Sequence, residues 1–261
     1  MNGRKLLIYY SIINNGDFYK IYDCVLGDRH VSEEEVDRVL STVKSNVVTM
    51  LDPEYPQELK KISPPPLVLF YYGDLSLVSS VEKNIGVVGS RDYSEYGASI
   101  TESIVKDIAE RLNVVSGMAI GIDTIALKTA IENHGKVIAV LPSGIDCCYP
   151  KRNQALYDLI KKDHLLISEY PNNLEPDPNY CRMRNRIIAA LGSSLLVAEA
   201  KGNSGTLITI NYTLMQGKEI FCVPYRANEG SHCNRLIKEG ALMVENGNDI
   251  LFELGKNTQK S

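Results

Sequence analysis

The sequence predicts an α/β protein with a doubly wound, mostly parallel sheet and a small helical domain on the N-terminal side of the sheet domain. From residue 85 onward, short apolar runs typical of buried strands alternate with longer amphipathic stretches typical of helices. Three consecutive prolines, 64–66, forbid helix and separate this pattern from a region with helical signals. Because crossovers between parallel strands are almost always right-handed, the alternation leads to an extended Rossmann-like fold.

The N-terminal region is predicted to contain two short helices, over residues 12–26 and 31–43. Ser32 is a suitable N-cap for the second helix, and Glu35 three residues later completes a capping box. The predicted parts of the chain are a helical domain with the start of a linker (1–62), the sheet domain (63–254) and a tail (255–261).

The sheet domain is predicted to begin with a strand over residues 67–72, a continuous apolar run closed by Gly73 and Asp74. Later strands are predicted at 85–88, 114–115, 137–141, 165–167, 194–198, 219–223 and 242–244. Helices are predicted to begin near Tyr96, Asp123, Asn153, Arg184, Gly205 and Asn234.

The composition limits which classes of protein fit. The 261 residues carry a formal net charge of −4, which argues against non-specific coating of nucleic acid but leaves a local basic groove open. No apolar run reaches the roughly eighteen residues of a membrane span, and the N-terminus lacks signal-peptide features, so we expect a cytoplasmic protein without membrane contact. The six cysteines form no Cys-x-x-Cys pair, so we expect reduced thiols and no metal site.

The turns that follow four of the predicted strands are rich in glycine and serine. Glycine allows close backbone approach, and the helix after each turn offers free N–H groups. Because ligands of open α/β sheets bind beyond the carboxyl ends of the strands, these turns together predict an anion site, although one such turn alone would fit plain structure. The residues concerned are Ser90 and Arg91, Gly117, Gly144, and the run Ser204, Gly205 and Thr206.

Two groups of cations are predicted to lie at the same edge of the sheet. Arg182, Arg184 and Arg186 stand at alternate positions ahead of an apolar run. We expect a helix to begin there, so that guanidinium groups and free N–H groups bind phosphate together. Lys151 and Arg152 precede another helix, where a solvated pair of charges is the alternative interpretation.

No cofactor is expected. The segment 86–91 lacks the third glycine of a dinucleotide fingerprint, and no acidic residue ends the next predicted strand to hold a ribose. The glycine-rich lysine loop of nucleoside triphosphatases is also missing from the sequence.

These motifs, in this order, resemble the DprA/Smf family of DNA-processing proteins. The resemblance covers roughly residues 50–250 and is loose before them, where many members carry a small helical domain. It rests on Gly89-Ser90-Arg91, Ser116 to Asp123, Tyr149-Pro150-Lys151, Ser168-Glu169-Tyr170, Arg184 to Ala189, Ser204 to Thr209 and Leu236 to Ala241.

The resemblance implies a protein that binds single-stranded DNA, forms a homodimer and loads the recombinase RecA during natural transformation, without being an enzyme. In the family's pattern Arg91 and Lys151 hold phosphates. Arg186 has an alternative role, in which it braces the turns through Glu169 or Glu199. The expected DNA-binding residues are Ser90, Arg91, Gly117, Gly144, Lys151, Arg152, Asn153, Arg184, Asn185, Arg186, Ser204, Gly205 and Thr206.

The sequence departs from the family's pattern at three places. Residues 125–127 are Ile-Ala-Leu where the family usually carries an Ala-His pair, and residues 223–225 are Val-Pro-Tyr in place of Val-Pro-Gly. The chain ends soon after Leu254, so we expect no C-terminal winged-helix domain and DNA binding by the sheet domain alone.

Two other functions remain open. One is a nucleotide-sensing module that binds a free nucleotide in the same turns without chemistry. The other is a LOG-type nucleotide phosphoribohydrolase, whose Gly-Gly-x-Gly-Thr-x-x-Glu motif would need a glutamate at Thr209 and a glycine at Asn203. Hydrolysis of a glycosidic bond needs a carboxylate, which threonine does not supply.

The C-terminal apolar residues are expected to form a dimer interface. The alternative is ordinary packing of an edge strand within one chain. The residues concerned are Leu236, Ile237, Leu242 and Val244.

Overall fold

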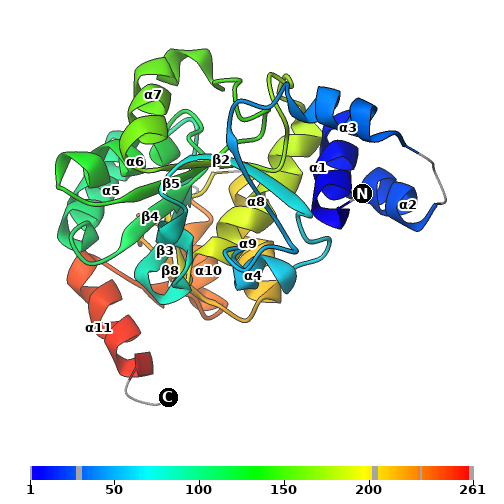
Figure 1. Ribbon diagram of the computed structural model, residues 1–261. Coiled ribbons are helices and arrows are strands. Elements are labelled where there is room, and N and C mark those ends of the chain that lie inside the picture. The colour runs from blue at the N-terminus through cyan, green and yellow to red at the C-terminus, as the bar shows by residue number, and fades with distance from the viewer. Residues whose placement is uncertain (1, 28–30, 202–204, 230, 259–261) are drawn as a thin grey trace. The chain divides into compact units, whose positions relative to one another are not determined.

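The computed structural model describes residues 2–27, 31–201, 205–229 and 231–258 (Figure 1). The chain forms two compact units, one made of residues 1–79 and 140–184 and the other of residues 80–139 and 185–261. Its strands are mostly parallel and flanked by helices, which confirms the predicted α/β class. The predicted division at residues 62 and 63 stays a prediction.

The second unit contains a parallel sheet in which the direction of the strand order reverses at β3 (Asn84–Gly89). From β3 the chain moves outward through β4 and β5, then returns to the other side of β3 for β7 and moves outward again. The gap between the carboxyl ends of β3 and β7 is therefore the switch point at which such sheets bind ligands. The order is β5 (Val137–Val140), β4 (Asn113–Ser116), β3 (Asn84–Gly89), β7 (Ser194–Glu199), β8 (Glu219–Cys222) and β9 (Leu242–Met243).

Helices cover both faces of this sheet, as Figure 1 shows for α5 and α6 on one face and α9 and α10 on the other. α11 packs against α5. The strands agree with the predicted ones to within two residues at each end, and four of the helices begin within one residue of the predicted starts. The bounds are α5 (Glu95–Ile108), α6 (Ile122–Glu132), α9 (Gly205–Met215), α10 (Cys233–Lys238) and α11 (Gly247–Thr258), with a 3-10 turn at Val81–Lys83.

The first unit has an antiparallel arrangement. β2 pairs with β1 on one side and with β6 on the other, and α7 packs against β2 and β6. The predicted strand at 67–72 is confirmed as β2, whereas β1 has no counterpart among the predicted strands. The elements are α1 (Gly3–Ile13), α2 (Phe18–Leu26), α3 (Glu33–Leu40), β1 (Asn46–Thr49), α4 (Gln57–Lys60), β2 (Val68–Gly73), α7 (Gln154–Asp163) and β6 (Leu165–Ser168), with 3-10 turns at Leu75–Val78 and Lys151–Asn153.

The predicted helix over residues 12–26 is wrong, because the chain turns in its middle. Asn15 and Gly16 adopt positive φ angles of 52° and 72°, which end α1 before α2 begins. A Cβ on Gly16 would lie 2.6 Å from the carbonyl oxygen of Glu169, so only glycine fits. The predicted cap at Ser32 is confirmed, since its Oγ accepts from the Glu35 amide at 3.2 Å.

The predicted helix start at Arg184 is also wrong. α8 (Pro178–Leu191) begins in the first unit and ends in the second, and Arg184 lies in its second turn. Its start has a signal in the sequence, because Pro178 is suited to the first helical position and Asp177 accepts from the Asn179 amide at 2.8 Å. The arginines are therefore not at a helix N-terminus, and the free N–H groups expected beside them are absent.

Within the described residues, no helix is long and apolar enough to cross a membrane.

The end of α8 is held by one lysine. Lys218 donates from Nζ to the carbonyl oxygens of Ala189, Ala190 and Gly192 at 2.7–2.8 Å. A positive charge at a helix C-terminus satisfies carbonyls that have no partner within the helix and complements the helix dipole. This contact fixes α8 ahead of β7.

We predict that Lys218→Met lowers the free energy of unfolding by about 2 kcal/mol, because three carbonyl oxygens lose a charged donor. Urea denaturation followed by circular dichroism measures this loss. Lys128→Met, which removes an exposed lysine from α6, is the control and should leave the midpoint unchanged. Equal midpoints for both variants would show that the capping contact contributes nothing.

Candidate nucleic-acid interface

The turn after β3 is clamped against the turn after β4 in the second unit. A Cβ on Gly89 would lie 2.6 Å from Cγ1 of Ile122, the first residue of α6. Gly121 has a φ of +92°, and a Cβ there would lie 2.3 Å from the Ser90 carbonyl oxygen. That oxygen also accepts from the Ile122 amide at 3.2 Å. The two glycines let the turns approach and fix the backbone of Ser90.

Ser90 and Arg91 are neighbours with opposite surroundings. Ser90 is buried, and its Oγ donates to the Asp92 carbonyl oxygen at 2.7 Å, so its hydroxyl stabilises the turn. Arg91 is exposed, and its guanidinium forms no ion pair with any residue that the structure describes. Arg91 thus presents an unneutralised positive charge on a fixed turn at the switch point.

The turn after β7 is tied to the same place. Thr206 in the first turn of α9 donates from Oγ1 to the Gly89 carbonyl oxygen at 3.1 Å. Asn185 donates from Nδ2 to the carbonyl oxygen of Gly205 at 3.2 Å. Thr206 and Asn185 are both buried, so in this structure they hold backbone. Ser204, also predicted for the site, lies outside the described residues.

Gly117 is buried in the turn after β4. Its amide donates to Oδ2 of Asp123 at 3.2 Å, so a carboxylate of the chain already accepts from this N–H group. The side chain of Asp123 is itself buried in the first turn of α6. An aspartate in that turn occupies the position where an anion would otherwise bind.

The turn that follows Val140 in the first unit is also rigid. A Cβ on Gly144 would lie 2.2 Å from the Asn172 carbonyl oxygen, and the Gly144 amide donates to Leu174 at 2.8 Å. Tyr157 of α7 donates to the Ile145 carbonyl oxygen at 2.6 Å. Several backbone contacts therefore fix the loop that leads to Lys151.

Beside that loop, three side chains form a charged cluster. Tyr72 donates to Oδ1 of Asp146 at 2.7 Å, and Nζ of Lys161 lies 3.8 Å from the centre of the Tyr72 ring. Burial and the neighbouring carboxylate of Asp146 raise the pKa of Tyr72, so its hydroxyl stays protonated and keeps donating. The cluster anchors the loop at Asp146.

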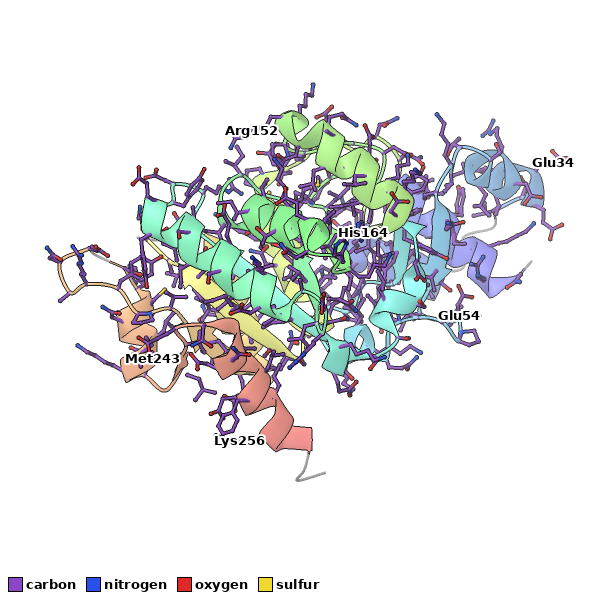
Figure 2. All side chains as sticks on the ribbon, turned by 90° about the vertical axis from the view of Figure 1, so that its left-hand side faces the viewer. Glu34, Glu54, Arg152, His164, Met243 and Lys256 are labelled. Atoms are coloured by element: carbon purple, nitrogen blue, oxygen red, sulfur yellow. The ribbon has the colours of Figure 1, made fainter. Side chains whose placement is uncertain are left out.

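Lys151 and Arg152 are the exposed cations of this loop. Both lie in the 3-10 turn ahead of α7, and Figure 2 shows Arg152 at that end of the helix. Neither forms an ion pair with a described residue. Asn153, predicted beside them, is only 7% exposed and belongs to the interior of the turn.

The structure places Arg184 and Arg186 in the interior. Arg184 is 4% exposed and donates from Nη1 to the Val140 carbonyl oxygen at the end of β5, and Arg186 is fully buried. The expectation of phosphate contacts by these two side chains therefore does not fit this structure, since phosphate needs access from solvent. The predicted contact between Arg186 and a carboxylate stays a prediction. Arg182, one helical turn earlier than Arg186, is exposed.

Sequence reasoning missed the anchoring role of Glu199. It is the last residue of β7, is fully buried, and accepts from the Ser94 amide at 2.9 Å and from Nζ of Lys201 at 3.0 Å. A signal was available, because an acidic residue that ends an otherwise apolar strand is rarely buried without partners.

Reactive side chains do not stand out at these turns. Burial raises the pKa of Cys148 to about 11, and burial together with Glu175 raises that of Cys147, so both thiols are neutral at pH 7. In the described part of the chain, no three His, Cys, Asp or Glu side chains are grouped to hold a metal ion. What the turns offer is exposed positive charge on a fixed backbone.

The chain is similar to known DNA-processing proteins. The family model for DNA recombination-mediator protein A matches residues 46–255. DNA processing protein DprA from Streptococcus pneumoniae is 40% identical over 230 residues, which are 87% of this chain and 78% of that protein. Protein Smf from Escherichia coli is 36% identical over 206 residues, 77% of this chain and 54% of that protein.

Solved structures give the same result. The X-ray structure of DprA from Streptococcus pneumoniae superposes with a TM-score of 0.78 at 34% identity, covering 95% of this chain and 93% of that one. DNA processing protein A from Helicobacter pylori, whose structure is described for its single-stranded DNA binding mode, gives 0.73 at 25% identity over 82% and 98% of the two chains. The predicted resemblance is confirmed, and the chain belongs to the DNA recombination-mediator protein A family, whose members are named DprA or Smf.

Proposed function

We propose that this protein binds the phosphate backbone of single-stranded DNA and acts as a recombination mediator that loads RecA. The observation that carries the proposal is the exposed positive charge of Arg91, Lys151 and Arg152, which have no ion-pair partner among the described residues and lie on turns whose backbones are fixed. The Helicobacter pylori relative is described as binding single-stranded DNA, which supports the same ligand here. A fixed backbone removes part of the ordering cost that phosphate binding by such side chains must meet.

The chemistry of these side chains indicates that phosphates rather than bases are recognised. Lysine and arginine on turns reach phosphate oxygens, which carry no sequence information. The buried polar residues, such as Ser90 and Thr206, are bonded to backbone and are not offered to bases. We therefore expect affinity that depends on salt and little on base sequence.

We propose that the protein has no catalytic activity of its own. In the LOG-type alternative a glutamate would stand at Thr209, but this threonine is 2% exposed and its hydroxyl cannot act as a carboxylate. Release of free base from a nucleoside monophosphate by the purified protein would contradict this part of the proposal.

We further propose a homodimer through the edge formed by β9 and α10. Met243 is 55% exposed at this edge, and Leu236, Ile237 and Leu242 are half-buried. Figure 2 labels Met243 on the outer side of the second unit. Val244, predicted for the interface, is 1% exposed and packs within the unit.

The first prediction concerns DNA binding. The double variant Arg91→Ala, Lys151→Ala should bind a labelled single-stranded oligonucleotide tenfold to a hundredfold more weakly in about 50 mM salt, because two phosphate contacts are lost. A titration across a salt series should show the slope of log K against log salt reduced by about 1.4, since each contact to a single strand contributes about 0.7.

The control for this experiment is Lys106→Ala, Lys128→Ala, which removes the same charge from exposed positions on α5 and α6. It should bind like the wild type. Equal losses in both double variants would mean that only net charge matters. Absence of oligonucleotide binding by the wild type, with tight binding of a mononucleotide, would favour the nucleotide-sensing alternative.

Dimer formation is predicted to depend on Met243. Met243→Asp should give a monomer in light scattering at micromolar concentration, because it places a charge in the centre of the proposed apolar contact. Met215→Asp changes an exposed methionine on α9 in the same way and should leave the dimer intact. A monomeric wild type would rule out the proposed interface.

RecA loading has its own assay. We expect the protein to increase DNA-dependent ATP hydrolysis by RecA on oligonucleotides already covered by a single-strand-binding protein. The Arg91→Ala, Lys151→Ala variant should give little increase. An unchanged RecA rate with wild-type protein that binds DNA normally would limit the function to DNA binding.

A further inference from the structure

We infer that Glu199 is a positioning residue for DNA, whose buried carboxylate fixes the loop 90–94 so that Arg91 is presented to a phosphate. The inference rests on the proposed function and adds to it a residue that does not touch DNA. Four observations carry it, all within the second unit: the place of Glu199, its partners, the space around its carboxylate and the exposure of the Arg91 guanidinium.

Glu199 lies beside the loop that it is proposed to hold. It ends β7 and is paired with Gly89 of β3, where the register shifts by one residue. This shift lies at the switch point, so the carboxylate is directly next to the turn that carries Arg91. A bulge beside a ligand site commonly redirects a side chain.

The carboxylate is connected to two parts of the loop, directly at Ser94 and through Lys201 at Asp92. Its oxygens accept from the Ser94 amide at 2.9 and 3.3 Å and from the Ser94 hydroxyl at 3.3 Å. Lys201 donates from Nζ to Glu199 Oε1 and to the Asp92 carbonyl oxygen, both at 3.0 Å. Ser94 is also the N-cap of α5 and accepts from the Gly97 amide at 3.0 Å. One charged pair thus holds Asp92, Ser94 and the start of α5.

The start of α5 is shaped around this carboxylate. A Cβ on Gly97 would lie 1.9 Å from Oε2 of Glu199, so any larger residue would displace it. Tyr225 closes the other side, with its hydroxyl donating to the Ala198 carbonyl oxygen at 2.9 Å. Burial and the nearby charge of Glu199 raise the pKa of Tyr225, which therefore stays neutral.

A purely structural role does not explain a charge in this position. Desolvating a carboxylate is costly, and apolar residues of similar volume often stabilise a core equally well or better. Glutamate is instead suited to accept from the Ser94 amide, the Ser94 hydroxyl and the Lys201 ammonium at one point. Its partner Lys201 keeps 38% of its side chain exposed, so the pair extends from the core to the surface of the loop.

These contacts fix the backbone on both sides of Arg91. The residues on both sides of it are fixed, Ser90 by the β4 turn and Asp92 by Lys201, while its own guanidinium is exposed. With the backbone on both sides already fixed, only the side chain of Arg91 has to be ordered when it binds phosphate. Loosening the loop should therefore reduce the contribution of Arg91 while leaving Lys151 unaffected.

The test is a double-mutant cycle between Glu199→Gln and Arg91→Ala, with the dissociation constant for a single-stranded oligonucleotide as the readout. We expect Glu199→Gln alone to weaken binding about tenfold, and Arg91→Ala to have a correspondingly smaller effect in its presence. Lys201→Met should show the same coupling with Arg91. It replaces Glu199→Gln in the cycle if that variant does not fold. Glu219→Gln, an exposed glutamate at the amino end of β8, is the matched control and should change nothing.

A second readout needs no DNA. Hydrogen exchange of the Ser94 amide should become faster in Glu199→Gln, while amides in the centre of β3 keep their protection. Effects of Arg91→Ala that are equal with and without each partner substitution would overturn the inference. Failure of the wild type to bind oligonucleotide would instead contradict the proposed function, and the exchange of Ser94 would still show whether Glu199 holds the loop.

Discussion

The site in the second unit depends on one close approach between two turns. Gly89 at the end of β3 lies against Ile122 at the start of α6, with no room for a Cβ between them. Gly121 brings its own backbone equally close to Ser90. Because this contact fixes the turn after β3, the direction of the chain into α5 and the place of Arg91 follow from it. A bulkier residue at either glycine would move the turn away from the switch point.

Charge is used in two distinct ways in this protein. Some charged groups are buried or half-buried and bonded to backbone: Arg184 holds the end of β5, Lys218 the end of α8, and Glu199 the loop before α5. Others, such as Arg91 and Lys151, are exposed without a charged partner among the described residues. Burial of charge is costly, and in the first group hydrogen bonds to backbone offset that cost and hold the elements in place. The second group is accessible to a ligand.

Much of the second unit could be predicted from the sequence. Its strands are short apolar runs bounded by glycine or serine, so β3, β7 and β8 were placed to within a residue or two. Elements without such contrast were missed. No strand is predicted over β1 and no helix over most of α1, although the Asn2 side chain caps α1 by accepting from the Arg4 amide. The helix over 12–26 failed because two residues with positive φ interrupt an otherwise apolar pattern.

The site was only partly predictable for a related reason. Spacing placed Arg91, Lys151 and Arg184 on turns or helices, but it does not tell which guanidinium faces solvent. That depends on tertiary packing, which buries Arg184 and Arg186 within α8 and leaves Arg91 exposed. The start of α8 differs from the prediction for a local reason, since Asp177 and Pro178 supply the helix start before the arginine run.

The most direct test of the account is chemical modification of arginines by phenylglyoxal, read by mass spectrometry with and without a single-stranded oligonucleotide. The account predicts that Arg91 and Arg152 react in the free protein and are protected by DNA, while Arg184 and Arg186 react in neither state. Arg38, exposed on α3, should react in both states. Reaction of Arg184 and Arg186 in the free protein, with protection by DNA, would contradict the separation between buried frame and exposed contacts.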